Sequence, residues 1–159
     1  MKNISLLLFS LLLSISSFCF AQKLELVGEQ VKIDGNEVLK YEKIQFYNFS
    51  LYDREEHEIL YFTMNSNDAF ENIAENYMIL NFVNNDVIVE TTDFSHIPFA
   101  LSAKKVSQGV IQWLVKEKVI DTEGHINEEK LTIFFRKYDQ QLTEKANKTE
   151  PTIIILDGN

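Results

Sequence analysis

The feature that most constrains the fold of this chain is a change of hydrophobic pattern at Pro98. Before this proline, short runs of β-branched and aromatic residues alternate with turn residues, a pattern typical of strands. After it, apolar residues recur at the spacing of amphipathic helices. Short turns join antiparallel neighbours, so strands first and helices second predict an α+β fold with an antiparallel sheet.

About six strands are expected before Pro98. The pair Asp34-Gly35 lies between the first two, 31–33 and 37–39, and favours a tight hairpin turn because glycine tolerates a positive φ. The segment 65–76 is ambiguous between a short helix and a loop. The remaining expected strands are 44–52, 59–64, 77–83 and 87–89, of which the apolar run 77–83 is either central or buried on both faces.

Two amphipathic helices are expected after Pro98, packed together on one face of the sheet. The first is predicted over 102–119 and is ended by the turn 121–124. The second begins after Asn127, a suitable N-cap, and its apolar face is predicted to be Leu131, Phe134, Phe135, Tyr138 and Leu142. The run 151–156 is rich in residues that favour strands. Two interpretations of it stay open: a last edge strand, or a C-terminal segment that lies along a groove.

Residues 1–21 have the layout of a secretory signal peptide. Lys2 precedes an apolar run over 4–20, and Cys19 and Ala21 place small side chains at −3 and −1 of a cleavage site. The run is slightly short for a transmembrane helix, which needs about 20 apolar residues. We therefore expect an exported protein, periplasmic or secreted and without a stable membrane anchor, whose single soluble domain covers 22–159.

Cleavage would also remove Cys19, the one cysteine of the chain. The exported domain could then hold no disulfide, no thiolate metal site and no cysteine nucleophile, so packing must stabilise it. Cys19 could instead carry a lipid anchor, but the bulky Phe18 before it suits that processing poorly.

The charge of the expected domain is strongly acidic. Without Lys2, the 15 basic residues become 14 against 24 acids, a net charge of −10. Nucleic acid and anionic lipid surfaces both need a basic footprint, so neither is an expected partner. A basic partner is compatible with this charge, and so is a simple role in solubility.

No catalytic, cofactor-binding or metal-ligating residue is predicted, and no cofactor. His57, His96 and His125 lack the spacing of a zinc site. The segment 121–129 resembles part of an EF-hand loop, but alignment on its glycine places Val119 and Lys130 at the end ligand positions. Asp93, Ser95 and His96 contain the residue types of a catalytic triad, but close neighbours in a chain do not easily adopt its geometry.

Carboxylates and aromatic residues leave further alternatives open. The pairs Glu55-Glu56, Glu71 with Glu75, and Glu128-Glu129 could serve a glycosidase, although an acidic chain contains such pairs by chance. An aromatic row on a sheet could bind sugar or peptide, whereas a core position for alternate members is the simpler interpretation. The row consists of Tyr41, Phe46, Tyr47, Phe49, Tyr52 and Tyr61.

Several features together resemble small uncharacterised exported proteins of Bacteroidetes-type bacteria. They are the Lys/Asn/Ile-rich composition, the leader ending in Phe20-Ala21 before Gln22, the segment 31–35, and the segment 116–121 before a glycine turn. The resemblance implies a periplasmic or secreted destination. It carries over no active-site residue.

The function expected from the sequence is a non-enzymatic binding or accessory module of the cell envelope. Its partner would be an envelope protein or a glycan, captured for instance by strand addition at a sheet edge. One alternative is a hydrolase of envelope or extracellular polymer that uses carboxylates, favoured if acids gather at one cleft. Another is a periplasmic inhibitor or immunity protein for a basic enzyme, favoured if acids spread over a convex face.

Overall fold

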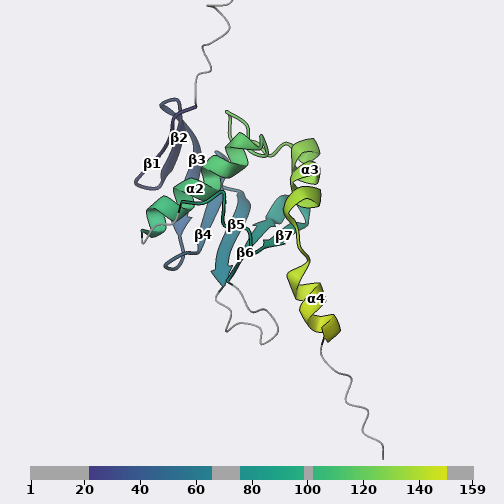
Figure 1. Ribbon diagram of the computed structural model, residues 1–159. Coiled ribbons are helices and arrows are strands. Elements are labelled where there is room, and N and C mark those ends of the chain that lie inside the picture. The colour runs from purple at the N-terminus through teal and green to yellow at the C-terminus, as the bar shows by residue number, and fades with distance from the viewer. Residues whose placement is uncertain (1–21, 66–75, 99–101, 150–159) are drawn as a thin grey trace, which may run out of the picture.

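The computed structural model describes residues 22–65, 76–98 and 102–149, which form an antiparallel sheet covered by helices (Figure 1). The seven strands of the sheet follow one another in chain order, and every neighbouring pair is antiparallel. The predicted α+β fold is confirmed. The elements are β1 (Leu24–Val27), β2 (Gln30–Ile33), β3 (Asn36–Lys43), β4 (Phe49–Tyr52), β5 (Glu58–Asn65), β6 (Tyr77–Phe82), the 3-10 turn η2 (Val83–Asn85), β7 (Val87–Thr91), α2 (Ala103–Lys116), α3 (Glu128–Tyr138) and α4 (Leu142–Thr149).

The strand that the sequence pattern missed is β1. It has only four residues, too few for alternation to be recognised, and it pairs with β2 from Leu24↔Ile33 to Val27↔Gln30. Gly28, with a φ of +62°, turns the chain between these two strands.

The single strand predicted over 44–52 is wrong in its first half. β3 runs to Lys43, a loop follows over 44–48, and β4 begins only at Phe49. The Asn48 carbonyl accepts hydrogen bonds from Ile44 N at 3.0 Å and Gln45 N at 3.2 Å. Its side-chain Oδ1 accepts another from Met64 N at 3.3 Å. These bonds close the loop and satisfy backbone groups that a continuous strand would have paired with a neighbour.

The core lies between the sheet and the helices α2 and α3, as expected. Figure 1 shows α2 crossing this face of the sheet and α3 beside it near β7. The sheet contributes large buried side chains such as Phe49, Phe62 and Leu80, and the helices contribute Leu114 and Phe134. The segment β6 is buried on both faces, because Met78 belongs to this core whereas Tyr77 packs against Ala146 of α4.

The first helix ends earlier than predicted, at Lys116. Lys118 adopts a left-handed φ of 61°, and Val119 N donates to Leu114 O at 2.9 Å, the long bond of a Schellman motif. Gly124 therefore does not stop the helix. With a φ of +91° it turns the loop that follows, where Ile120 and Ile126 form an isolated bridge.

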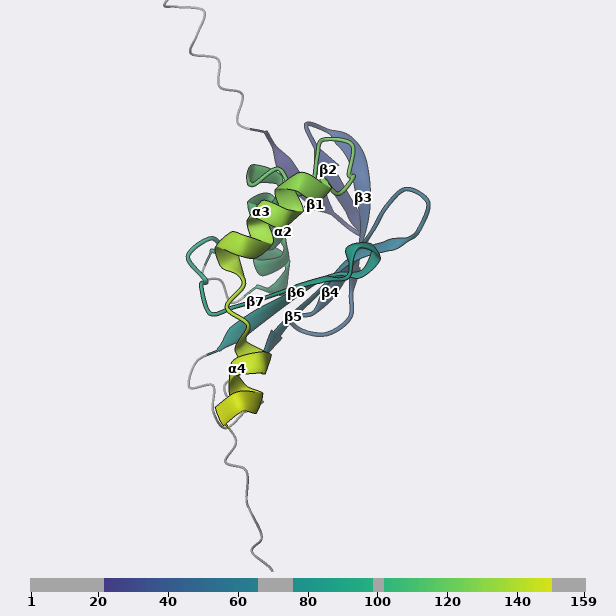
Figure 2. The same ribbon diagram turned by 90° about the vertical axis from the view of Figure 1, so that its right-hand side faces the viewer.

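The second helix is divided where the sequence predicted one continuous apolar face. The Asn127 side chain caps α3 as predicted, accepting from Lys130 N at 3.0 Å. However, Asp139 is extended and ends α3, so Leu142 belongs to α4 and packs with Ile79 on the opposite face of the sheet. Figure 2 shows the connection between the two helices running past β7.

Three predicted features lie outside the described residues: the signal peptide, most of the ambiguous segment 65–76, and the run 151–156. Within the part of the chain that is described, no helix is long and apolar enough to span a membrane.

Candidate functional site

An apolar pocket of about 460 Å³ opens between the sheet and the first turns of α2. Its walls come from five segments: the loop before β4, the end of β5, the start of β6, the connection from β7, and α2. All of the lining side chains that the structure describes, except one amide, are apolar or aromatic. They are Tyr47, Met64, Asn76, Phe94, Ile97, Pro98 and Val106.

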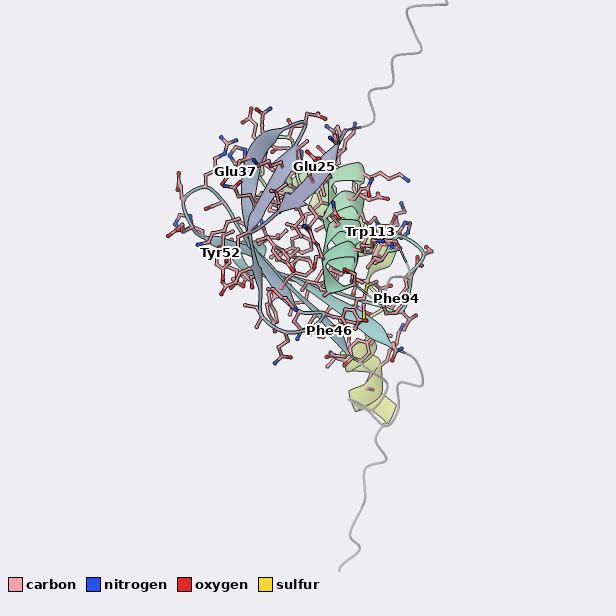
Figure 3. All side chains as sticks on the ribbon, turned by 90° about the vertical axis from the view of Figure 1, so that its left-hand side faces the viewer. Glu25, Glu37, Phe46, Tyr52, Phe94 and Trp113 are labelled. Carbon is pink, nitrogen blue, oxygen red and sulfur yellow. The ribbon has the colours of Figure 1, made fainter. Side chains whose placement is uncertain are left out.

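The loop 44–48 forms one wall. Asn48 ties it to β5, and the Asn48 amide donates to Gln45 Oε1 at 3.3 Å. This shape turns Tyr47 towards the core, while Phe46 remains 59% exposed. The two rings meet edge to face, with centroids 4.6 Å apart. Figure 3 shows Phe46 and Phe94 near the same end of α2.

The connection that follows β7 forms the opposite wall. Asp93 N donates to the buried Thr91 Oγ1 at 3.1 Å, Ser95 N donates to Asp93 Oδ1 at 2.9 Å, and Ile97 N donates to Phe94 O at 3.0 Å. The side-chain and backbone hydrogen bonds from Ser95 hold the pKa of Asp93 below its usual range. These local bonds fix a compact turn that presents Phe94 and Ile97 to the pocket.

Gly109 of α2 allows this wall to pack closely on the helix. A Cβ atom at this position would lie 2.3 Å from Pro98 Cδ and 3.3 Å from Ile97 Cγ2. Both contacts are closer than side chains tolerate without movement. A glycine inside a helix is otherwise unfavourable, so its presence here has a packing reason.

An aromatic cluster anchors the same connection from behind. The His96 ring stacks on Trp113, with centroids 4.9 Å apart and an interplanar angle of 9°. It also meets the edge of Tyr138 at 5.2 Å. Trp113 is buried, and its Nε1 has no hydrogen-bond partner among the described groups. His96 thus holds the pocket wall against both α2 and α3.

Glu117 completes the polar side of this cluster. It accepts a hydrogen bond from Tyr138 Oη at 2.6 Å and another from Lys137 Nζ at 3.0 Å. Burial raises the pKa of Glu117, but these two hydrogen bonds and the Lys137 charge together outweigh burial, so the pKa lies below its usual range. The carboxylate therefore links the end of α2 to the end of α3.

The structure brings Asp93, Ser95 and His96 together, but in an arrangement that differs from a catalytic triad. The aspartate is the central group, because the Ser95 hydroxyl hydrogen bonds to it and His96 Nε2 lies 3.5 Å from its Oδ2. A nucleophilic serine needs a histidine as its own hydrogen-bonding base. The three residues shape the turn instead.

The other two histidines lie in two copies of one turn, Asp-x-Glu-x-His, which sequence analysis missed. In each copy the aspartate Oδ1 accepts from the backbone N of the histidine, at 2.9 Å for both Asp53–His57 and Asp121–His125. The histidine Nδ1 lies 3.2 Å and 3.5 Å, respectively, from the other carboxylate oxygen. The equal spacing in the sequence was the available signal.

Backbone hydrogen bonds to the aspartates close these turns. Burial raises the pKa of Asp53 and of Asp121, but the backbone hydrogen bonds they accept outweigh it and lower both pKa values. Within the described ranges, no group of three or more His, Cys, Asp or Glu side chains is placed to hold a metal ion.

The two predicted carboxylate pairs that the structure describes do not line the pocket. Glu55 and Glu56 lie on an exposed turn, where Glu56 pairs with Lys40 at 3.3 Å. Glu128 and Glu129 occupy the first turn of α3. Glu71 and Glu75 lie outside the described residues.

The aromatic row is divided between the core, the pocket and the surface. Tyr41 and Phe49 are core residues, as the simpler interpretation expected. Tyr47 lines the pocket and Phe46 is exposed. Tyr52 lies on the outer face of the sheet, where its hydroxyl donates to Glu42 Oε2 at 2.8 Å.

The sheet edge at β7 is closed to strand addition at its C-terminal end, at Glu90 and Thr92. Gln140 N donates to Glu90 O at 2.7 Å, and Glu90 N donates to Asp139 Oδ1 at 2.9 Å. The Gln140 side chain accepts from Thr92 N at 3.1 Å. The segment between α3 and α4 therefore occupies the hydrogen-bonding positions that an added strand would need.

No family model matches this chain, and neither a curated protein nor a solved structure matches it. The pocket is therefore interpreted from its own chemistry.

Proposed function

We propose that this chain is an exported, non-enzymatic binding module of the cell envelope, and that its ligand is a small apolar molecule held in the pocket between the sheet and α2. The observation that carries the proposal is the pocket's combination of size and lining. Its volume of about 460 Å³ is within the range of small-molecule sites, roughly 300–1,000 Å³.

The lining favours binding over catalysis. Tyr47, Met64 and Phe94 are only partly buried, although each packs against the core. A ligand that covers them would gain about 25 cal/mol for each Å² of apolar surface removed from water. Among the described residues, the lining side chains include no carboxylate, histidine or hydroxyl nucleophile other than the Tyr47 phenol. The protein or glycan partner expected from the sequence stays a separate prediction beside this ligand class.

A neutral fluorescent probe, N-phenyl-1-naphthylamine, tests the proposal on protein purified in its exported form. We expect saturable probe fluorescence that is strongly reduced in Met64→Trp, because the larger side chain fills the pocket. Ile88→Trp is the control, since Ile88 is 50% exposed on β7 and does not line the pocket. Probe binding that is absent, or equal in both variants and the wild type, would contradict the proposal.

A carboxylate hydrolase is the second candidate, and one observation favours it. Asp86 and Glu128 line a shallower polar hollow of about 340 Å³, together with Asn84 and Asn85. Paired acids across a cleft are the residues that glycoside hydrolysis uses. Turnover of an envelope polysaccharide by the wild type, lost in Glu128→Gln while the melting temperature is retained, would support this candidate over the first.

A further inference from the structure

We infer that the ligand is a single-chain amphiphile with an anionic head, whose tail enters the apolar pocket while its head lies beside Lys43 and Lys104. This inference rests on the proposed function, because it assigns a chemical class to the ligand of the same pocket. It adds a second hollow, of about 450 Å³, which lies on the other side of the Phe46–Tyr47 pair and is lined by both lysines.

The two hollows are adjacent. Phe46 lines the second hollow and Tyr47 lines the first, and their rings touch edge to face. On the helix side, Ser102 lines the second hollow and Val106 lines the first, and the Val106 N donates to Ser102 O at 3.1 Å across one helical turn. A molecule that occupies the apolar pocket can therefore reach the second hollow without leaving the surface.

The chemistry of the second hollow is basic in a chain that is otherwise acidic. Its lining, over the residues 22–65, 76–98 and 102–149, includes two lysines and no acid, against a formal net charge of −9 for the whole chain. Both lysines are exposed, and within the described residues neither forms an ion pair with a carboxylate. The Lys43 ammonium instead lies over the Phe46 ring, 5.5 Å from its centroid.

The exposed Phe46 fits the same assignment. Phe46 is 59% exposed and lies between the basic hollow and the apolar pocket. The part of an amphiphile that joins its head to its tail would cover this aromatic ring. An uncharged apolar ligand would form no ion pair with the two lysines, and a cationic ligand would be repelled by them. Charge complementarity therefore selects an anionic head over the other two.

The test compares three amphiphiles of equal chain length below their micelle concentrations: laurate, lauryl alcohol and dodecyltrimethylammonium. Each is titrated against bound N-phenyl-1-naphthylamine on protein in its exported form. We expect laurate to displace the probe roughly three- to tenfold more tightly than lauryl alcohol, the gain typical of two exposed charge pairs. Added salt should reduce this preference because it screens exposed charges.

Variants separate a local effect from the effect of net charge. Lys43→Gln with Lys104→Gln should abolish the ratio by which laurate binds more tightly than lauryl alcohol. Lys32→Gln with Lys116→Gln makes the same change of net charge away from both hollows and should keep the preference. If both double variants lose the preference for laurate to the same extent, the inference is overturned.

The outcomes also distinguish this inference from the proposed function. If laurate and lauryl alcohol displace the probe equally, or the ammonium compound is preferred, the pocket proposal stands and the anionic head is wrong. If none of the three displaces the probe and the probe itself does not bind, both fail.

Discussion

At the scale of single residues, one methyl group added at Gly109 tests how the pocket wall packs on α2. Gly109→Ala should destabilise the fold by about 1–3 kcal/mol, because the new Cβ would overlap Pro98. This is the opposite of the gain of roughly 0.5–1 kcal/mol that alanine usually provides inside a helix. Denaturant unfolding measures the change, with the exposed Gln112→Ala in the same helix as control. A stabilised Gly109→Ala would show that the wall does not pack on α2 as described.

Glu117 provides a test of electrostatics at the same scale. Its folded pKa lies below the ordinary value of 4.5, so its stabilising effect is complete above that value and is lost as pH falls through the folded pKa. Glu117→Gln should therefore cost about 1 kcal/mol at neutral pH, and the difference from wild type should close in acid. Melting temperatures between neutral and acidic pH measure this. Glu129→Gln is the control, because this side chain is 80% exposed, and its melting temperature should equal that of the wild type at every pH. A melting-temperature difference between Glu117→Gln and the wild type that grows as pH falls would refute the lowered pKa of Glu117.

At the scale of elements, the packing of α3 on the sheet should depend on Phe134. This side chain is 1% exposed, whereas the neighbouring Ile133 is 47% exposed. Phe134→Ala should cost about 3–5 kcal/mol, because a large side chain is lost and a cavity remains. Ile133→Ala should change the free energy of unfolding little. If Phe134→Ala and Ile133→Ala both have the same free energy of unfolding as the wild type, α3 does not cover the sheet.

The end of α2 offers a stabilising substitution. Lys118 has a left-handed φ of 61°, a conformation that costs non-glycine residues energy. Lys118→Gly should raise the free energy of unfolding by roughly 0.5–1 kcal/mol. The same change at Gln112, inside the helix, should lower it by a similar amount. Loss of stability at position 118 would show that the Schellman ending is incorrect.

Local signals predicted some elements well. Asp34-Gly35 and Asn127 act through neighbours in the chain, so the hairpin and the helix cap could be predicted. The loop at Asn48 and the break at Asp139 could not, because Met64 and Glu90, distant in sequence, supply their decisive hydrogen bonds.

The pocket was beyond sequence analysis for the same reason. Its lining comes from five segments that carry no shared motif, and apolar side chains of this kind are indistinguishable from core residues until the fold places them. The one local signal was Gly109, a glycine in the middle of a helical pattern.

At the scale of the whole molecule, export is the first prediction to check. The intact mass of protein recovered from its native host should correspond to a chain that begins at Gln22, with or without loss of ammonia from that glutamine. A mass that retains residues 1–21, or that includes acyl chains on Cys19, would contradict soluble export.

The proposed function requires an apolar ligand to lie between the sheet and α2. The most direct measurement is isotope-filtered NMR of the exported protein with lauryl alcohol, which reports protein protons close to the ligand. We expect intermolecular contacts from the alkyl chain to the methyl groups of Met64, Ile97 and Val106, which come from three separate segments. Contacts confined to exposed side chains such as Val27 and Ile88, or no contacts at saturating ligand, would contradict the proposed function.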